Sequence, residues 1–322
     1  MAERIEWGEG VVRATRDLTA DIRLFEIAPQ GRLIPPSPGS HINVGVRIGD
    51  RSDVRCYSIV GPCADGLYHI AVKRLQNSRG GSAYLWRLAP GARLSISAPS
   101  NHFELGLGRP DYLLLAGGIG ITPIYSHALA LVRAGANFRL LYACHGRGDA
   151  ALAPELAREI GDRLQLFVVE DGARVDIAAE IARLDPDGEF YVCGPIGMLE
   201  DAKRAWRDSG RPIDQLRFET FGNSGRRPQV AFTAHIPRLG KAISVGVNQS
   251  LLEALEAAGV DMIYDCRRGE CGLCALPILS VDGELDHRDV FFSEAEKAAN
   301  AKLCTCVSRV YGGSITLDTA DR

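Results

Sequence analysis

Several features that would place this chain of 322 residues in a simple class are missing from its sequence. No run of about 18 apolar residues occurs, so we expect no transmembrane helix. The opening stretch MAERIEWGEG has no apolar segment, so we expect no secretory signal peptide. No basic block stands out in a chain with a net charge of −3, which argues against nucleic-acid binding. These absences predict a cytoplasmic protein that binds neither membranes nor nucleic acid.

The nine cysteines are not expected to form disulfides, because the cytoplasm is reducing. Three of them, Cys266, Cys271 and Cys274, lie in the stretch DCRRGECGLC. A zinc site usually has two separate ligand pairs, whereas this stretch has one C-x2-C pair and His287 has no partner at zinc spacing. The spacing C-x4-C-x2-C with a distant fourth cysteine is typical of plant-type [2Fe–2S] sites. The sequence therefore favours a [2Fe–2S] cluster over zinc, a disulfide knot or a chance group of small thiols.

A loop that presents three thiolates at once must bend sharply, and Gly269 and Gly272 permit such a bend. Backbone N–H groups turned toward the sulfurs would raise the reduction potential of the cluster. The stretch LCTCVSR offers two candidates for the fourth ligand, Cys304 and Cys306. Because residues i and i+2 of a strand share a face, spacing leaves both candidates open.

The chain divides into segments of different sequence pattern. Alternating stretches such as HINVGVRI, broken by Gly, Pro and Asp, predict an antiparallel β-barrel over residues 1–105. Apolar runs such as YLLLAGG alternate with helical stretches over 106–222, which predicts an α/β domain with a doubly wound parallel sheet. Residues 223–229 have the composition of a linker. A third domain over 230–322 combines strand-like runs with a helix that has a capping box, Ser250 and Glu253, and ends near Gly259.

The stretch AGGIGITP (116–123) connects the first strand of the predicted parallel sheet to a helix. Its glycines would let the backbone approach a ligand, while Thr122 could cap the helix and Pro123 suits the first helical position. A helix that begins here could bind a dinucleotide pyrophosphate, although the third glycine of G-x-G-x-x-G is missing and a structural turn is the alternative. The stretch YVCGP (191–195) ends a later strand at the same edge.

Two stretches of the first segment carry polar groups suited to a flavin. RCYS (55–58) offers a cation, an aromatic ring and a hydroxyl, and SRGGS (78–82) offers the parts of a phosphate-binding turn. Either stretch alone could be a polar loop. NADH releases two electrons as a hydride, whereas a [2Fe–2S] cluster accepts one at a time, and a flavin can do both.

Together these stretches, with FETFG (218–222) and the C-terminal cysteine pattern, resemble the phthalate dioxygenase reductase and vanillate O-demethylase reductase family over nearly the whole chain. The resemblance implies a flavin-binding barrel, an NAD-binding α/β domain and an α+β ferredoxin domain of β-grasp fold. It implies an NADH-dependent oxidoreductase that passes electrons through FMN and a [2Fe–2S] cluster to a Rieske non-haem iron oxygenase. FMN is implied over FAD because the ferredoxin domain is C-terminal.

The resemblance also implies roles for individual residues. The flavin ring would be contacted by Arg55, Tyr57, Ser58, Val72 and Lys73. Its phosphate would be held by Arg79, Gly80, Gly81 and Ser82. NADH would be bound by Gly118, Gly120, Thr122, Cys193, Gly194 and Pro195, with Glu219 and Phe221 completing the face between flavin and nicotinamide. The reacting region would include Ser58, Thr122, Cys193 and Glu219. The fourth cluster ligand would be Cys306, which leaves Cys304 as a packing thiol.

Some alternatives stay open at this stage. His145 and Arg147 follow the second strand of the parallel sheet, and an arginine there could accommodate the 2′-phosphate of NADPH. The acceptor could be a haem monooxygenase, or the cluster could regulate binding in a redox-sensing protein without turnover. Docking is expected at the rim of the cluster loop, which carries Arg267, Arg268 and Glu270. The stretch DHRD (286–289) matches a family stretch that usually begins with Glu.

Overall fold

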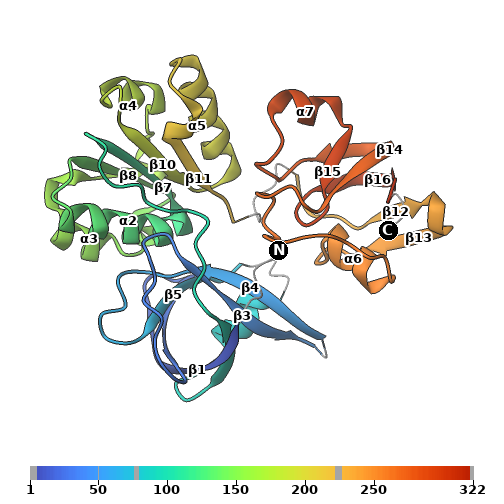
Figure 1. The fold of residues 1–322 in the computed structure, drawn as a ribbon, viewed down its shortest axis with the longest axis horizontal. Helices are drawn as coiled ribbons and strands as arrows, with labels where there is room; N and C mark the ends of the chain where they lie inside the picture. The colour runs from blue at the N-terminus through green and yellow to red at the C-terminus, as the bar shows by residue number, and fades with distance from the viewer. Residues whose placement is uncertain (1–5, 50, 76–79, 222–226, 320–322) are drawn as a thin grey trace. The chain divides into compact units, whose positions relative to one another are not determined.

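The computed structural model describes residues 6–49, 51–75, 80–221 and 227–319. The chain divides into two compact units, which meet in the sequence between Glu219 and Thr220. In the described residues the first unit contains a six-stranded and a five-stranded sheet, and the second unit contains another five-stranded sheet. Figure 1 shows these sheets with their helices. The predicted combination of a barrel, an α/β fold and a ferredoxin-like fold is confirmed.

The first sheet is antiparallel, with its strands in the order β4-β3-β6-β1-β2-β5. Its strands are β1 (Trp7–Asp17), β2 (Ile22–Pro29), β3 (His41–Ile48), β4 (Arg51–Ser58), β5 (Tyr68–Lys73) and β6 (Arg93–Ser97). A bridge between Ile59 and Ile70 brings the chain after β4 beside edge strand β5, so the sheet curls into a partial barrel. Alternate side chains, among them Phe25, Val44 and Ile96, fill its core. A short helix, α1 (Gly81–Trp86), packs against the sheet and was not predicted from the alternation.

The second sheet is parallel, with its strands in the order β11-β10-β7-β8-β9. Its strands are β7 (Tyr112–Gly117), β8 (Phe138–Cys144), β9 (Leu164–Val168), β10 (Glu189–Cys193) and β11 (Leu216–Glu219). Helices α2 (Ile121–Arg133) and α3 (Ala153–Ile160) cover one face, and α4 (Ile177–Arg183) and α5 (Ile196–Asp208) cover the other (Figure 1). Strand order reverses between β7 and β10, and ligands of such sheets bind where the carboxyl ends of strands meet this reversal.

Helix α2 fastens the parallel sheet to the barrel. The hydroxyl of Ser126 donates to the carbonyl of Ile59 at 2.9 Å and accepts the N–H of Gly61, also at 2.9 Å. The next residue, His127, is fully buried, with Nε2 2.9 Å from the carbonyl oxygen of Phe103. Because Ile59 directly follows β4, the end of that strand is held in register with the helix that follows the glycine-rich turn.

The sheet of the second unit is mixed, in the order β13-β12-β16-β14-β15, with β12 and β16 parallel. Its strands are β12 (Phe232–Ile236), β13 (Lys241–Val245), β14 (Ala275–Asp286), β15 (Lys302–Cys304) and β16 (Arg309–Leu317), and its helices are α6 (Leu251–Ala257) and α7 (Glu294–Ala299). The predicted capping box at the start of α6 is confirmed, because Ser250 and Glu253 exchange hydrogen bonds of 3.1 and 2.7 Å. Gly259 has a φ of 74° just after the helix, as predicted for its C-terminal cap.

Candidate functional site

The end of β4 carries a buried hydroxyl that none of the described groups satisfies. Ser58 is buried, and its Oγ has no hydrogen-bond partner among the described residues. A buried polar atom left unpaired costs free energy, so this hydroxyl is suited to a bound group that completes its hydrogen bonding. Tyr57 beside it is half-buried in the barrel wall, and burial raises the pKa of its phenol above the ordinary value, which keeps it neutral. This edge therefore fits a flavin ring.

The predicted phosphate-binding turn is described only in part, because Arg79 lies outside the described residues. Gly80 has a φ of 99°, a conformation that favours glycine, and it precedes the first turn of α1 with Ser82. A Cβ on Gly81 would lie 2.7 Å from Cγ and Nε of Arg55, so the arginine side chain packs directly over this turn. Arg55 also pairs with Asp53 at 2.8 Å. The structure thus brings RCYS and the second half of SRGGS together.

Val72 and Lys73 at the end of β5 have other side-chain partners. Val72 is buried in the barrel core, and its carbonyl accepts the indole N–H of Trp86 at 3.0 Å. The ammonium group of Lys73 lies 3.3 Å from the carboxylate of Asp21. A contact of Val72 with a flavin would therefore come from its backbone rather than from its side chain.

The glycine-rich turn after β7 forms a short 3-10 turn, Gly118–Gly120, ahead of α2. A Cβ on Gly120 would overlap the carbonyl oxygen of Cys193, because the end of β10 passes directly against the turn. The prediction that Thr122 caps α2 is wrong. The helix begins at Ile121, so Thr122 is its second residue, and its hydroxyl donates to the carbonyl of Ile119 at 3.0 Å. Pro123 is consequently the third helical residue rather than the first.

The carboxyl ends of three neighbouring strands are aligned at this edge. Cys193 is paired in register with Ala116 of β7 and with Glu219 of β11, and both Cys193 and Glu219 are buried. Gly194 follows, and a Cβ on it would lie 3.1 Å from Cα of Gly117. Pro195 then precedes the first residue of α5. The predicted nucleotide residues of β7 and β10 are therefore brought together.

Phe221 is half-buried and belongs to the second unit, which begins at Thr220.

The two basic residues that follow β8, His145 and Arg147, both lie beside acids that follow β9. Arg147 lies 2.7 Å from Asp171, and Nε2 of His145 lies 3.4 Å from a carboxylate oxygen of Glu170. An arginine that binds a 2′-phosphate must present its guanidinium to that phosphate. In this structure the guanidinium of Arg147 is already paired with the carboxylate of Asp171.

The cysteine loop directs backbone donors at a sulfur, as predicted. Sγ of Cys266 accepts the N–H groups of Arg268, Glu270 and Cys271, each at 3.4 Å. Gly269 and Gly272 have φ values of 77° and 73°, which glycine tolerates and other residues resist. Hydrogen bonds of this kind stabilise a thiolate, so the loop is suited to a thiolate-bound metal cluster.

The two candidates for the fourth ligand do not share a strand face. Strand β15 ends at Cys304, and Cys306 lies in the following turn, where the N–H of Ser308 donates to the carbonyl of Cys304 at 3.0 Å. Hydrogen bonds from the thiols of Cys304 and Cys306 lower the pKa of Cys274 to about 3. The same bonds raise the pKa of both donors. The backbone N–H of Gly269 opposes this rise in the pKa of Cys306.

The thiols near the loop form two groups. Within the described residues, no group of three or more His, Cys, Asp or Glu side chains converges as the shell of a single metal ion. A zinc site requires such a shell. In a two-iron cluster the four thiolates are divided between two irons, two to each. Cys266 interacts with Cys271, and Cys274 interacts with both Cys304 and Cys306, so enough thiols gather on each side to supply two to each iron.

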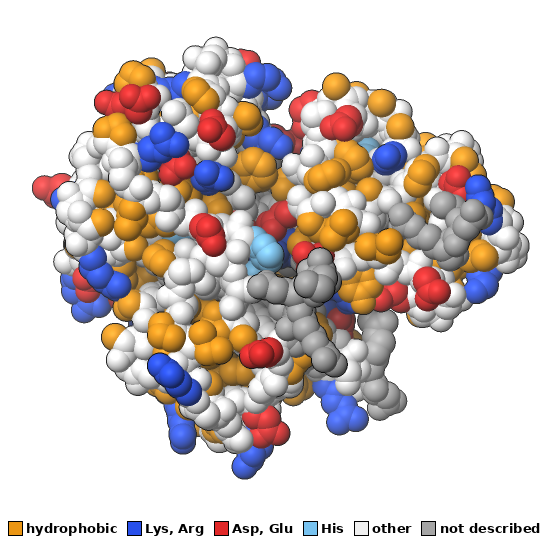
Figure 2. Space-filling view, viewed as in Figure 1, with side chains coloured by type: hydrophobic (Ala, Val, Ile, Leu, Met, Phe, Trp, Pro, Cys, Tyr) orange, Lys and Arg blue, Asp and Glu red, His pale blue; other side chains and the backbone are white. Residues whose placement is uncertain are grey.

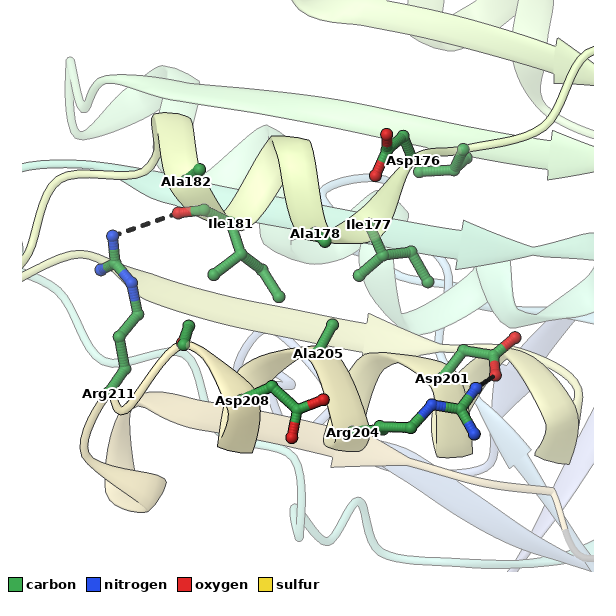
Figure 3. Close-up of a pocket in the computed structure, with 12 residues that line it drawn as sticks. Asp176, Ile177, Ala178, Ile181, Ala182, Asp201, Arg204, Ala205, Asp208 and Arg211 are labelled. Atoms are coloured by element: carbon green, nitrogen blue, oxygen red, sulfur yellow. Dashed lines mark hydrogen bonds and ion pairs between the residues drawn. The ribbon is translucent and has the colours of Figure 1, made fainter.

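A groove of about 700 Å³ lies between α4 and α5 (Figure 3). Its floor is apolar, with Ile177, Ile181 and Ala205, and its charged residues have structural partners. Asp201 pairs with Arg204, and Arg211 donates to carbonyls at the end of α4. None of the predicted site residues lines this groove.

Comparisons with known families and proteins agree with the two motifs. Residues 114–204 match the oxidoreductase NAD-binding domain, and residues 235–311 match the 2Fe-2S iron-sulfur cluster binding domain. Among the described residues, no helix combines the length and the hydropathy needed to cross a membrane.

Relatives of known name align along almost the whole chain. Tetrachlorobenzoquinone reductase of Sphingobium chlorophenolicum is 38% identical over 96% of both chains. The heme-dependent oxidative N-demethylase beta subunit of Ectopseudomonas mendocina is 36% identical over 95% of this chain and 97% of its own. The solved structure of phthalate dioxygenase reductase, described as transferring electrons from pyridine nucleotides to [2Fe–2S], is 30% identical and superposes with a TM-score of 0.78 over 97% of this chain and 98% of its own. The chain therefore belongs to the phthalate dioxygenase reductase-like family: it is an oxidoreductase that passes electrons from NAD(P)H through a flavin and a 2Fe-2S cluster to oxygenase subunits.

Proposed function

We propose that this chain is an NADH-specific reductase that uses FMN and delivers electrons to a Rieske non-haem iron oxygenase. The proposal includes Cys266, Cys271, Cys274 and Cys306 as the cluster ligands. It also includes three domains over residues 1–105, 106–222 and 230–322, with a linker over 223–229. The observation that carries it is the cysteine loop, in which the sulfur of Cys266 already accepts several backbone N–H groups. We place the protein in the cytoplasm, where thiols stay reduced.

The flavin, when bound, supplies hydride chemistry with the nicotinamide, and the cluster supplies one-electron transfer. Ser58 completes its hydrogen bonding at the flavin edge, and Tyr57 packs beside the ring. Arg55 and the turn with Gly80, Gly81 and Ser82 hold the phosphate. Arg79 belongs to the same proposed set by sequence.

The nucleotide is held where β7, β10 and β11 end. Gly118 and Gly120 allow the pyrophosphate to approach the backbone. The hydroxyl of Thr122 stabilises this turn by donating to the carbonyl of Ile119. Cys193, Gly194 and Pro195 line the nicotinamide, together with Glu219. Phe221 belongs to the same proposed set by sequence. The choice of FMN rests on the C-terminal position of the ferredoxin domain, and the phosphate turn agrees with it, since FMN ends at that phosphate.

The preference for NADH is supported by the ion pair between Arg147 and Asp171. A 2′-phosphate would have to displace this carboxylate and would also meet the carboxylate of Glu170. The negative charge of the two acids disfavours a further dianion, whereas the ribose of NADH carries none.

Cys306 is the better fourth ligand because it faces the loop. Val307, the next residue, packs against the loop, because a Cβ on Gly269 would lie 2.6 Å from its Cγ2. Cys304 is then a fully buried packing thiol, in an apolar cluster with Leu252 and Phe292 that also contains Cys274 and Cys306.

The expected docking rim is apolar rather than charged. Arg267 pairs with Glu256 at 3.1 Å, and Arg268 pairs with Glu270 at 3.1 Å, so these charges are satisfied within the unit. Leu273 in the loop and Phe291 beside it are 49% and 48% exposed. A Cβ on Gly272 would overlap the ring of Phe291, so this ring lies directly on the loop. Figure 2 shows apolar side chains gathered on the visible face of the second unit. The oxygenase would dock on this rim, since electrons must leave close to the cluster.

An anaerobic titration of the purified protein with NADH tests the proposal. Bleaching of the flavin, together with the low-temperature EPR signal of a reduced [2Fe–2S] cluster, is the expected result. Bleaching without that signal would contradict the order of electron transfer. Mass spectrometry of the released flavin distinguishes FMN from FAD.

A haem-dependent oxygenase is the second candidate acceptor, because a relative at 36% identity is the beta subunit of a heme-dependent oxidative N-demethylase. Reconstitution with candidate oxygenase components separates the two acceptors. A redox-sensing role without turnover predicts no steady NADH-dependent reduction of cytochrome c.

A further inference from the structure

The stretch Asp286–Asp289 supplies no proposed ligand, yet it contains a carboxylate, Asp289, that is fully buried. A buried carboxylate is costly unless it is hydrogen-bonded and paired. Burial alone would raise the pKa of Asp289, but hydrogen bonds from His287 and from the N–H of Phe292 hold this pKa below its ordinary value. The carboxylate is therefore ionised in the folded protein.

The carboxylate of Asp289 is held from several sides. One oxygen lies 3.2 Å from the hydroxyl of Ser308 and 3.4 Å from Nδ1 of His287. The other oxygen accepts the N–H of Phe292 at 3.0 Å. The positive charge of Lys297 also lowers the pKa of Asp289 and so favours the ionised carboxylate. Such a set of contacts fixes the position of the carboxylate.

These contacts connect the two segments that supply the cysteines. On one side, the N–H groups of Val290 and Phe291 donate to the carbonyl of Gly269 at 2.9 and 3.2 Å, and a Cβ on Gly269 would lie 2.9 Å from Cα of Asp289. On the other side, Ser308 donates its N–H to the carbonyl of Cys304. The backbone of Asp289 and of the two residues after it packs against the three-cysteine loop, and the carboxylate of Asp289 bonds to Ser308 in the turn that follows the fourth ligand. Asp289 thus links the two segments.

A fixed negative charge beside a redox centre makes addition of an electron less favourable, more strongly so in a buried setting. Reduction of a [2Fe–2S] cluster adds one negative charge. Asp289 lies directly against Gly269 of the three-cysteine loop, and its carboxylate accepts the hydroxyl of Ser308, two residues after Cys306, so its charge lies between the two cysteine segments.

We propose that Asp289 is a positioning residue that links the two cysteine segments and whose buried charge lowers the reduction potential of the cluster. This inference rests on the proposed cluster ligands. It assigns a role to a residue that binds neither the metal nor a substrate.

The test is a redox titration of the full-length holoprotein with dithionite and mediators, in which EPR measures the reduced cluster. In Asp289→Asn, which keeps the shape but removes the charge, the ratio of reduced to oxidised cluster at a fixed potential should rise about tenfold, a shift of about 59 mV for one electron. Asp282→Asn removes an exposed carboxylate from β14 and should leave the ratio within about twofold. Ser308→Ala keeps the charge but removes one of its hydrogen bonds, so the potential should fall.

Opposite shifts in Asp289→Asn and Ser308→Ala support the proposal, because damage to the fold alone would not move the potential in two directions. If Asp289→Asn cannot retain the cluster, Ser308→Ala alone tests the proposal: a lower reduction potential in this variant supports it, and an unchanged or higher potential overturns it. An unchanged potential in Asp289→Asn, or shifts of the same sign in both variants, would overturn it. A wild-type protein without a cluster signal would overturn the ligand assignment itself, which is a distinct result.

Discussion

The cysteine loop and the flavin edge differ in how far the chain completes each site by itself. In the loop, the sulfur of Cys266 already accepts N–H groups from residues at most five positions away. At the flavin edge, the buried hydroxyl of Ser58 has no partner among the described residues. The flavin edge is also assembled from strands and a helix that are distant in sequence. A site built locally keeps its shape when the cofactor is absent, whereas a site built from distant segments depends on its ligand and on the packing of its unit.

The largest effect is expected from Cys306→Ser, which removes a thiolate from the locally built site. The variant should lose the [2Fe–2S] absorption and EPR signals, and NADH-dependent reduction of cytochrome c should fall by at least about a hundredfold. Bleaching of the flavin by NADH should be retained, because the flavin site lies in the other unit. Cys304→Ser is the matched control and should keep its cluster. Loss in Cys304→Ser with retention in Cys306→Ser would refute the ligand assignment.

Acid should weaken the first unit through His127. Burial lowers the pKa of His127 to about 4, whereas the unfolded chain titrates near 6.5. The unfolded state thus binds more protons between these values, so stability falls as the pH drops through this window, by up to about 3 kcal/mol. All three tryptophans lie in the first unit, so urea unfolding followed by tryptophan fluorescence at pH 7.5 and pH 5 reports on this unit. In His127→Gln the free energy of unfolding should change less between pH 7.5 and pH 5. A change as large as in the wild-type protein would show that other groups cause the pH dependence.

Gly120→Ala should damage the nucleotide site, because a Cβ there overlaps the carbonyl of Cys193. We expect kcat/KM for NADH to fall about a hundredfold, equivalent to about 2.7 kcal/mol of transition-state stabilisation. Gly8→Ala, at a glycine with open space around it, should be neutral. Steady-state kinetics at several NADH concentrations measures both variants. Full activity in Gly120→Ala would show that the strand end can move aside.

Ser58→Ala should separate the function of the hydroxyl from stability. Flavin reduction by NADH should slow about tenfold, the value of one lost hydrogen bond, while the unfolding free energy of flavin-free protein stays unchanged or rises. Ser97→Ala should behave in the opposite way, because the hydroxyl of Ser97 accepts the N–H of Asn43 and donates to the carbonyl of Ala98. Stopped-flow absorbance and urea unfolding measure the two quantities. A stability loss in Ser58→Ala equal to that in Ser97→Ala would indicate a structural role.

The smallest effect is expected from Asp171→Asn, which frees Arg147 at an exposed ion pair. Exposed pairs contribute at most about 1 kcal/mol, so the ratio of kcat/KM for NADPH over NADH should rise only about fivefold. Asp162→Asn, at an exposed acid of the same sheet domain, should leave the ratio unchanged. An unchanged ratio in Asp171→Asn would mean that the 2′-phosphate is excluded elsewhere.

Local patterns predicted most of the fold and the three cysteines of the loop, because strand alternation, the capping box at Ser250 and the C-x4-C-x2-C spacing depend on neighbouring residues. Features that depend on tertiary contacts escaped. The helix starts at Ile121, directly after Gly120, the residue against which β10 packs, so Thr122 is not its cap. The pairing of Arg267 with Glu256 could not be read from the loop alone. The isolated hydroxyl of Ser58 is visible only once the strand is placed in the barrel.

The hydroxyl of Ser126 bears on whether domains can be exchanged between related reductases. One atom both accepts from and donates to the backbone that follows β4, and so registers a barrel on a nucleotide-binding sheet through main-chain groups alone. Every residue other than proline offers the same main-chain groups, although the φ of 80° at Gly61 favours glycine. A barrel from another reductase could therefore seat on this sheet whatever its side chains at that junction, provided that its backbone there keeps the same course. Chimeras cut between the barrel and the sheet would then keep the spacing between flavin and nicotinamide, provided that Ser126 and the contact of His127 with Phe103 are kept.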